Sequence, residues 1–266
     1  MNDAGKILNP FEHALLRPDK YIGSKITTKK KEWVFDDETK SMIYREIIYN
    51  PGLVHLVIEV LSNAIDNVFR SIISNVKMTK IQFSIDFDPE SETFGWITVL
   101  NDGYPILAKS NVYTLENGVK EEMYPVQAFF TKMLAGTNFE NDKTRKTSGR
   151  NGIGAKTMVI FSEQCIIEHT DPNNRKKVIL EISENGKNKG KPKVTSFSGV
   201  NGYTKVAFLP DYSYFDFNIE DSDTQVDFLG ILKRLVYDCA MITKLNVSFN
   251  GEKLKVDSLL KYAKLY

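Results

Sequence analysis

A long apolar helix places the strongest constraint on how this chain can fold. Pro51 stands where a helix would begin, and apolar side chains recur at helical spacing from Leu53 to Ile72. At about 100° per residue, these side chains cover well over half of the helix circumference. The helix must therefore be largely buried, with other elements around most of its surface. The apolar positions are Leu53, Leu56, Val57, Val60, Leu61, Ala64, Ile65, Val68 and Ile72.

The remaining face of this helix carries only acids and amides before Arg70. Glu59, Asn63, Asp66 and Asn67 follow the spacing i, i+4, i+7, i+8 and fall within about 100° of arc. A solvated stripe is the ordinary interpretation of such a face. Two carboxylates without an intrahelical counter-charge also suit a bound cation. A hard cation would take the neutral oxygen of Asn63, which leaves Glu59 free to accept a proton from water.

The rest of the chain predicts further helices and a sheet. Apolar and polar residues alternate from Ile81 to Phe87, and Gly95 to Leu100 can pair with that strand as a hairpin. Asn250-Gly251 predicts another hairpin turn. Helices against a mixed or mostly antiparallel sheet make a two-layer α/β (α+β) sandwich. Further helices are expected at 12–17, 126–134, 155–161 and 225–241, and further strands at 32–35, 45–49, 165–169, 177–182, 203–211, 246–249 and 253–256.

Composition limits the setting and the partners. The 266 residues, 42% of them apolar, suit one large globular domain, and 35 basic against 34 acidic side chains mean that any DNA contact must be local. Cys165 and Cys239 have no disulfide or metal spacing, which favours an intracellular setting with both thiols buried and inert. His13, His55 and His169 lie on different elements, and packing or surface roles are expected for each. No apolar run reaches the length of a membrane span, so no membrane partner is expected.

A glycine-rich loop from Ser148 to Lys156 precedes the helix expected at 155–161. Its spacing, G-x-x-G-x-G-x-K, matches neither the P-loop nor the dinucleotide fingerprint. Bare backbone N–H groups, together with Arg150 and Lys156, are suited to an anion, although a flexible turn explains such a loop equally well by itself. An anion-binding loop combined with a Mg²⁺-ready helix is more specific, and the pair predicts a nucleoside triphosphate site.

The segment Asn101-Asp102-Gly103 follows the strand that ends at Leu100. By itself this tripeptide predicts only a turn. At the end of a sheet beside a triphosphate site, its short side chains could read the edge of the adenine.

These segments resemble the GHKL, or Bergerat-fold, ATPases. Glu59 to Asn67 resembles their helical N-box, Asn101 to Gly103 their adenine-side box, and Gly149 to Lys156 their phosphate lid. The stretches EHALLRPDKYIGS (12–24) and YTKVAFLPD (203–211) narrow the resemblance to type IIA DNA topoisomerases of eukaryotes and large viruses. A chaperone of the Hsp90 type would share the nucleotide site but would not explain these two stretches.

The resemblance implies a role for each matching residue. Glu59 would be the general base, Asn63 the Mg²⁺ ligand and Asn101 the adenine contact, while Thr137 and Asn138 would contact the ribose and phosphates. The cofactors implied are ATP and Mg²⁺. The ATP-binding set is Asn63, Asp66, Asn67, Asn101, Thr137, Asn138, Gly149, Arg150, Asn151, Gly152, Ile153, Gly154, Ala155 and Lys156.

Four places depart from the family pattern. Tyr104-Pro105 lacks the second glycine of the adenine-side box, Gly136 replaces a serine, Ser148 replaces a glycine, and Ile153 stands where a tyrosine is usual. These departures affect the expected adenine and ribose contacts and leave Glu59 and Asn63 unchanged.

The resemblance also implies the domain plan and the partners. Residues 1–9 would be an N-terminal segment, disordered or a dimer arm, and 10–266 the ATPase domain. A transducer domain, with a lysine that reaches the terminal phosphate, and a DNA-cleavage core would lie outside this chain. The whole enzyme would bind duplex DNA and dimerise on binding ATP in the nucleus, host cell or virion. This chain alone would be monomeric, with weak or no hydrolysis.

One alternative function keeps the same fold but lacks ATP hydrolysis. The irregular adenine-side box and the basic loops at 25–31 and 187–193 would suit a nucleotide-sensing or DNA-binding module without useful hydrolysis.

Overall fold

A single mixed sheet forms the centre of the computed structural model, which describes residues 8–115, 117–133 and 152–266. Its strands follow the order β10-β8-β7-β11-β4-β3-β12-β13, and β9 pairs with β8. Every neighbouring pair is antiparallel except β3 and β12, so the predicted mixed, mostly antiparallel sheet is confirmed. The strands are β3 (Lys80–Ile85), β4 (Ile97–Asp102), β7 (Ser162–Asp171), β8 (Lys176–Ser183), β9 (Asn188–Lys189), β10 (Lys193–Ser196), β11 (Tyr203–Pro210), β12 (Asn246–Phe249) and β13 (Glu252–Lys253).

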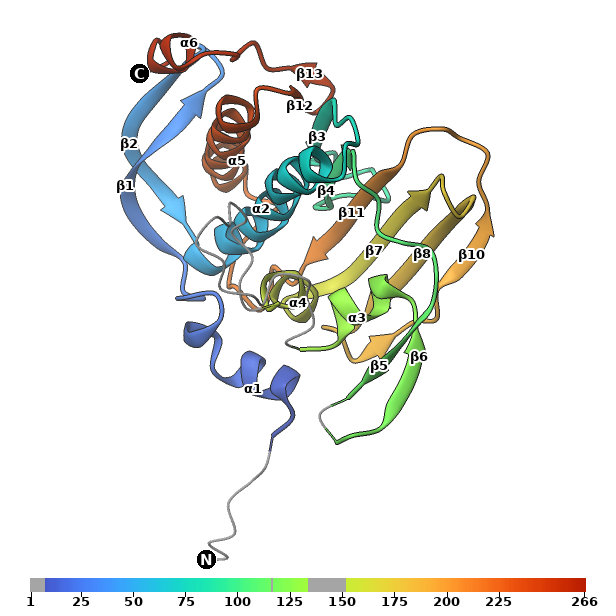
Figure 1. Cartoon of the computed structure of the whole chain (residues 1–266). Coiled ribbons are helices and arrows are strands. Elements are labelled where there is room, and N and C mark those ends of the chain that lie inside the picture. The colour runs from blue at the N-terminus through green and yellow to red at the C-terminus, as the bar shows by residue number, and fades with distance from the viewer. Residues whose placement is uncertain (1–7, 116, 134–151) are drawn as a thin grey trace, which may run out of the picture.

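Helices cover one face of this sheet, as the two-layer prediction requires (Figure 1). Helix α2 contacts α4, α5 and strand β4, and α4 also contacts α3, β7 and β11. A separate hairpin of β1 (Thr28–Asp36) and β2 (Ser41–Tyr49) packs against α5, which therefore lies between the hairpin and the rest of the fold. The helices are α1 (Pro10–Leu16), α2 (Pro51–Ile73), α3 (Pro125–Thr131), α4 (Gly154–Ile160), α5 (Ser222–Thr243) and α6 (Leu259–Ala263), with a 3₁₀ turn at Pro18–Lys20.

Helix α2 begins where the sequence predicts. The side chain of Asn50 caps it by accepting a hydrogen bond from the Leu53 amide (2.9 Å), and Pro51 occupies its first turn. The Asn50 amide also donates to the carbonyl of Phe215, which fixes the start of the helix against the segment before α5. Caps of this kind each stabilise a helix by about 1 kcal/mol.

The expectation that no segment reaches the length of a membrane span needs correction. Helix α2, at Pro51–Ile73, has the length and a hydropathy of 1.3 that a span requires, and 56% of that window is buried inside the protein. A core helix of a folded domain produces the same signal, because it is apolar around most of its circumference.

Several strand and turn predictions are confirmed, and others were missed. Asn250 and Gly251 have φ angles of 46° and 82°, as the predicted two-residue hairpin turn between β12 and β13 requires. The sequence did not predict the pairing of β5 (Asn111–Thr114) with β6 (Lys120–Met123) or the parallel pairing of β12 with β3. Both depend on contacts that no local pattern specifies.

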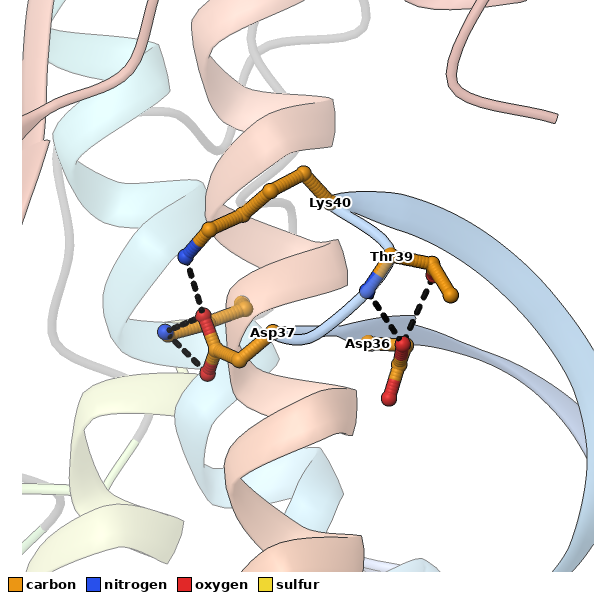
Figure 2. Close-up of polar contacts among 5 residues, drawn as sticks. Asp36, Asp37, Thr39 and Lys40 are labelled. Carbon is orange, nitrogen blue, oxygen red and sulfur yellow. Dashed lines mark hydrogen bonds and ion pairs between the residues drawn. The ribbon is translucent and has the colours of Figure 1, made fainter.

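The turn of the β1–β2 hairpin is fixed by short polar contacts (Figure 2). The Asp36 carboxylate accepts hydrogen bonds from the backbone amide of Thr39 at 2.8 Å and from its hydroxyl at 2.7 Å. Next to it, Asp37 pairs with Lys40 across the turn and with Lys233 of α5, whose ammonium lies 2.6 Å from one carboxylate oxygen. The second ion pair ties the hairpin to the helix layer.

Some lysines of the two basic segments make ion pairs and hydrogen bonds within the fold. Lys29 to Lys31 lie in strand β1 rather than in the loop predicted at 25–31, and Lys30 pairs with Glu32 at 2.9 Å. In the other segment, Lys193 pairs with Glu181 at 2.8 Å, and Lys189 donates to the Thr131 carbonyl. These contacts weaken the interpretation of either segment as a DNA-binding patch.

The two cysteines are buried, as predicted. Burial raises the pKa of each thiol, Cys165 and Cys239, to about 12. Thiols with such a pKa are poor nucleophiles at neutral pH.

Candidate active site

The polar stripe of α2 divides into an accessible half and a buried half. Glu59 and Asn63 are half-buried, whereas Asp66 and Asn67 are 2% and 6% exposed. The accessible side chains of the stripe are therefore those of Glu59 and Asn63.

The glycine segment before α4 lies directly against Glu59. A Cβ atom built on Gly154 would lie 1.7 Å from Oε2 of Glu59 and 2.7 Å from its Cδ. Only a residue without a side chain permits this approach. The structure therefore brings together the predicted general base and the predicted phosphate lid, which are far apart in the sequence.

His55 is a further member of this cluster that the sequence did not single out. Its Nε2 lies 3.2 Å from Oε1 of Glu59. The two residues are four positions apart on α2 and share one face of the helix. That spacing was available from the sequence, but a lone histidine without metal spacing gave no reason to use it.

Lys156 is 1% exposed at the start of α4, and burial lowers its pKa to about 8. A desolvated ammonium is stabilised by a nearby anion. The adjacent Thr157 hydroxyl donates to the carbonyl of Gly154 at 2.7 Å and fixes the first turn of the helix. Gly152 has a φ of 58°, in the left-handed region that favours glycine.

Asp66 and Asn67 contact the protein itself. Asp66 interacts electrostatically with Arg70, one turn later, where burial lowers the pKa of the guanidinium and the Asp66 charge opposes that shift. The Asn67 amide donates to the carbonyl of Asp102 at 3.4 Å. This bond joins the inner end of the stripe to the end of β4.

The predicted turn at 101–103 is wrong for its first two residues, because β4 continues to Asp102. Asn101 is 7% exposed, and its amide donates to the carbonyl of Asp102 at 3.0 Å. The Asp102 carboxylate accepts hydrogen bonds from the backbone amides of Thr79 and Lys80, at 2.8 and 2.9 Å, and from the Thr79 hydroxyl. Asp102 therefore anchors the start of β3.

Gly103 is required by its conformation and its surroundings. Its φ is 111°, and a Cβ there would lie 2.5 Å from Oγ of Ser71. The same hydroxyl accepts a hydrogen bond from the Tyr104 amide at 2.8 Å, so the chain after β4 is fixed to α2.

Part of the predicted site lies outside the described residues. These positions are Thr137, Asn138, Gly149, Arg150 and Asn151. Ile153, at the N-cap of α4, and Ala155 are half-buried beside Gly154.

Comparisons with known proteins agree with this arrangement. No protein-family model matches the chain. Over 260 residues it is 37% identical to DNA topoisomerase 2 of Candida albicans, an alignment that covers 97% of this chain and 16% of that protein. It superposes on the ATPase region of Saccharomyces cerevisiae topoisomerase II with a TM-score of 0.86 and 33% identity, covering 100% of this chain and 65% of that chain.

A second structure contains two domains in one chain. The ATPase and transducer domains of DNA topoisomerase II from Balamuthia mandrillaris match with a TM-score of 0.84 and 31% identity, covering 98% of this chain and 63% of that one. This chain therefore spans less than two thirds of each of these relatives.

The sheet, the helix layer and the glycine segment against α2 have the GHKL-type fold of the topoisomerase II ATPase region. Within that class, the chain is homologous over essentially its whole length to the ATPase region of type II DNA topoisomerase.

Proposed function

We propose that this chain binds ATP with Mg²⁺ and hydrolyses the terminal phosphate, as the ATPase domain of a type II DNA topoisomerase. The observation that supports this most directly is the contact between Gly154 and the carboxylate of Glu59. A general base for phosphoryl transfer must lie beside the terminal phosphate, and a glycine segment allows backbone to approach that phosphate closely.

In this proposal Glu59 accepts the proton of the attacking water. His55 positions the carboxylate through its contact with Oε1. The segment from Gly149 to Lys156 surrounds the triphosphate, and the Lys156 ammonium compensates phosphate charge that builds up during transfer. Because Lys156 is buried, little water competes for its charge.

The oxygen of Asn63 suits Mg²⁺. The side chain is half-buried one turn after Glu59 and makes no hydrogen bond with the residues that the structure describes. Mg²⁺ prefers oxygen ligands and is usually held by one or two protein groups together with substrate phosphates. When bound, the ion would neutralise phosphate charge, and Asn63 would hold it beside Glu59.

The adenine ring of the nucleotide would lie toward the end of β4, where Asn101 would contact it. Thr137 and Asn138 would contact the ribose and phosphates. Asp66 and Asn67 would support this end of the site through Arg70 and Asp102.

We further propose that residues 10–266 form one domain of a longer intracellular enzyme. A transducer domain would supply a lysine to the terminal phosphate, so hydrolysis by this chain alone would be slow. In the parent enzyme, ATP would drive dimerisation, and the closed dimer would pass one DNA duplex through a break in another.

Substitution of Glu59 tests the central assignment. In the parent enzyme, Glu59→Gln is expected to lower ATP turnover at least 100-fold, the usual contribution of a general base, with affinity for a nonhydrolysable ATP analogue within about threefold. Glu38→Gln, on the exposed hairpin turn, is the matched control and should behave as wild type. Full turnover in Glu59→Gln would exclude Glu59 as the base, and a wild type that binds ATP without hydrolysing it would favour the nucleotide-sensing alternative.

Two neighbouring substitutions separate metal binding from positioning. Asn63→Ala should weaken nucleotide binding at least tenfold in the presence of Mg²⁺ and leave binding in EDTA unchanged. His55→Ala should lower kcat several-fold without changing nucleotide affinity, because His55 contacts Glu59 and not the nucleotide. Equal losses with and without Mg²⁺ in Asn63→Ala would contradict its role as the metal ligand.

A further inference from the structure

A buried histidine on strand β7 has unsatisfied hydrogen-bonding groups. His169 is 0% exposed, and neither ring nitrogen makes a hydrogen bond of good geometry within the described part of the chain; the backbone of Ile106 offers the ring one weak hydrogen bond. The carboxylate of Asp171 and the backbone at Ile106 favour a protonated ring, but burial outweighs both and lowers its pKa to about 4. The ring is therefore neutral at pH 7, with one nitrogen as donor and the other as acceptor.

Leaving a buried ring nitrogen unpaired is costly. A buried donor or acceptor without a partner destabilises the folded protein, and the Ile106 backbone can satisfy at most one of the two ring nitrogens. An apolar residue of similar size would avoid that cost. Buried unsatisfied groups of this kind point to a partner that the free protein lacks.

The sheet register aligns His169 with the predicted adenine contact. Thr204 of β11 lies directly opposite His169 on one side and opposite Asn101 of β4 on the other. Residues opposite each other in antiparallel strands project from the same face of a sheet. The three side chains therefore form one row across β4, β11 and β7.

This row lies on the face that the helices cover. Val99, two residues before Asn101, and Ile167, two residues before His169, belong to the hydrophobic core under those helices. At one end, the row meets α2 through the bond between Asn67 and the Asp102 carbonyl. The line from Glu59 along the α2 stripe to Asn101 thus continues across the sheet to His169.

We propose that His169 is a specificity-determining residue that recognises the base of the nucleotide. This inference rests on the proposed function and adds a second base contact to Asn101. A neutral imidazole presents one donor and one acceptor, and adenine presents an amino donor beside the ring acceptor N1. Because the two ring nitrogens point in divergent directions, one of them would meet one of these adenine groups, either directly or across one ordered water.

The ring is enclosed, so access to it depends on the segment after β4. Ala108 donates to the Asp171 carboxylate at 2.8 Å and holds that segment beside His169. Movement of the segment, or an ordered water, would connect the ring to the base.

Binding measurements on two variants test this proposal. His169→Phe removes both hydrogen-bonding groups, while His169→Gln keeps a donor and an acceptor. Dissociation constants are measured for ATP, GTP and inorganic triphosphate with Mg²⁺. In His169→Phe, ATP affinity should fall at least tenfold and the preference for ATP over GTP should shrink, whereas inorganic triphosphate affinity stays unchanged. His169→Gln should retain more of the ATP affinity than His169→Phe. Ile167→Val, on the same face of β7, is the control and should match wild type.

The outcomes separate this inference from the function on which it rests. A wild-type chain that binds neither ATP nor inorganic triphosphate contradicts the proposed function. If the wild type binds ATP and the variants keep its ratio of ATP affinity to inorganic triphosphate affinity, the role of His169 is overturned and the proposed function is not affected. If His169→Phe does not fold, the test uses His169→Gln instead. In that variant, an unchanged ratio of ATP affinity to inorganic triphosphate affinity, together with an unchanged preference for ATP over GTP, would overturn the proposal.

Discussion

Gly154 and Glu59 occupy adjacent space, and a side chain on one would displace the other. A Cβ on Gly154 would overlap Oε2 of Glu59 at 1.7 Å. The contact joins helix α4 to helix α2, which pack together in the layer over the sheet. The glycine therefore sets the position of the predicted general base.

Gly154→Ala is expected to lower ATP turnover 10- to 100-fold, because the added methyl group forces the Glu59 carboxylate to rotate away. The flexible carboxylate can move at little cost, so the melting temperature should change by no more than about 2 °C, which corresponds to less than about 1 kcal/mol. Turnover and thermal unfolding are the two measurements. In the double variant with Glu59→Gln, Gly154→Ala should add no further loss, since both changes act through the same group. Independent, additive losses would contradict this coupling.

Lys156→Met should separate stability from binding. Burial disfavours the ammonium, as its lowered pKa of about 8 indicates, and this offsets the loss of its contacts within the fold, so the unfolding temperature of the apo protein should change little at pH 7. Affinity for ATP should fall at least tenfold because a charge beside the phosphates is lost. Lys191→Met, in an exposed loop, serves as the control for calorimetry. Loss of stability without loss of affinity would assign Lys156 a structural role.

Asp102→Ala should reduce stability rather than specific binding. The carboxylate accepts hydrogen bonds from the amides of Thr79 and Lys80, and its removal leaves both without that acceptor. The expected cost is about 2–3 kcal/mol in the free energy of unfolding, measured by denaturant titration. Asp102→Asn, which keeps one acceptor oxygen, should lose less. A stable Asp102→Ala protein that no longer binds ATP would instead make Asp102 a nucleotide contact.

Protonation of His169 should contribute to the pH dependence of the free energy of unfolding. Its pKa falls from 6.5 in the unfolded chain to about 4 in the folded protein, so between these values the unfolded chain binds the proton and the folded protein does not. Stability therefore decreases as the pH falls through this window, by about 2 kcal/mol between pH 7 and pH 5.

Denaturant titrations at the two pH values measure this effect. His169→Phe should lose that component, and its free energy of unfolding should change by about 2 kcal/mol less than that of wild type over the same interval. Equal changes in the two proteins would show that the folded ring protonates normally.

Much of the fold followed from local patterns. The apolar repeat from Leu53 to Ile72 predicted a buried helix, and Asn250-Gly251 predicted a tight hairpin, because period and turn conformation are properties of neighbouring residues. The parallel pairing of β12 with β3 and the β5–β6 hairpin were missed, since pairing depends on long-range packing.

The sequence by itself determined which side chains could carry the chemistry, because spacing on a helix places Glu59 and Asn63 on one face and residue type sets what each can bind. Only the tertiary structure decided which of them meet. It placed Gly154 against Glu59, turned Asp66 and Asn67 inward, assigned Asp102 to the start of β3, and aligned His169 with Asn101. The reason is physical: helical periodicity is fixed within a few residues, whereas burial and cross-strand register depend on how distant segments pack.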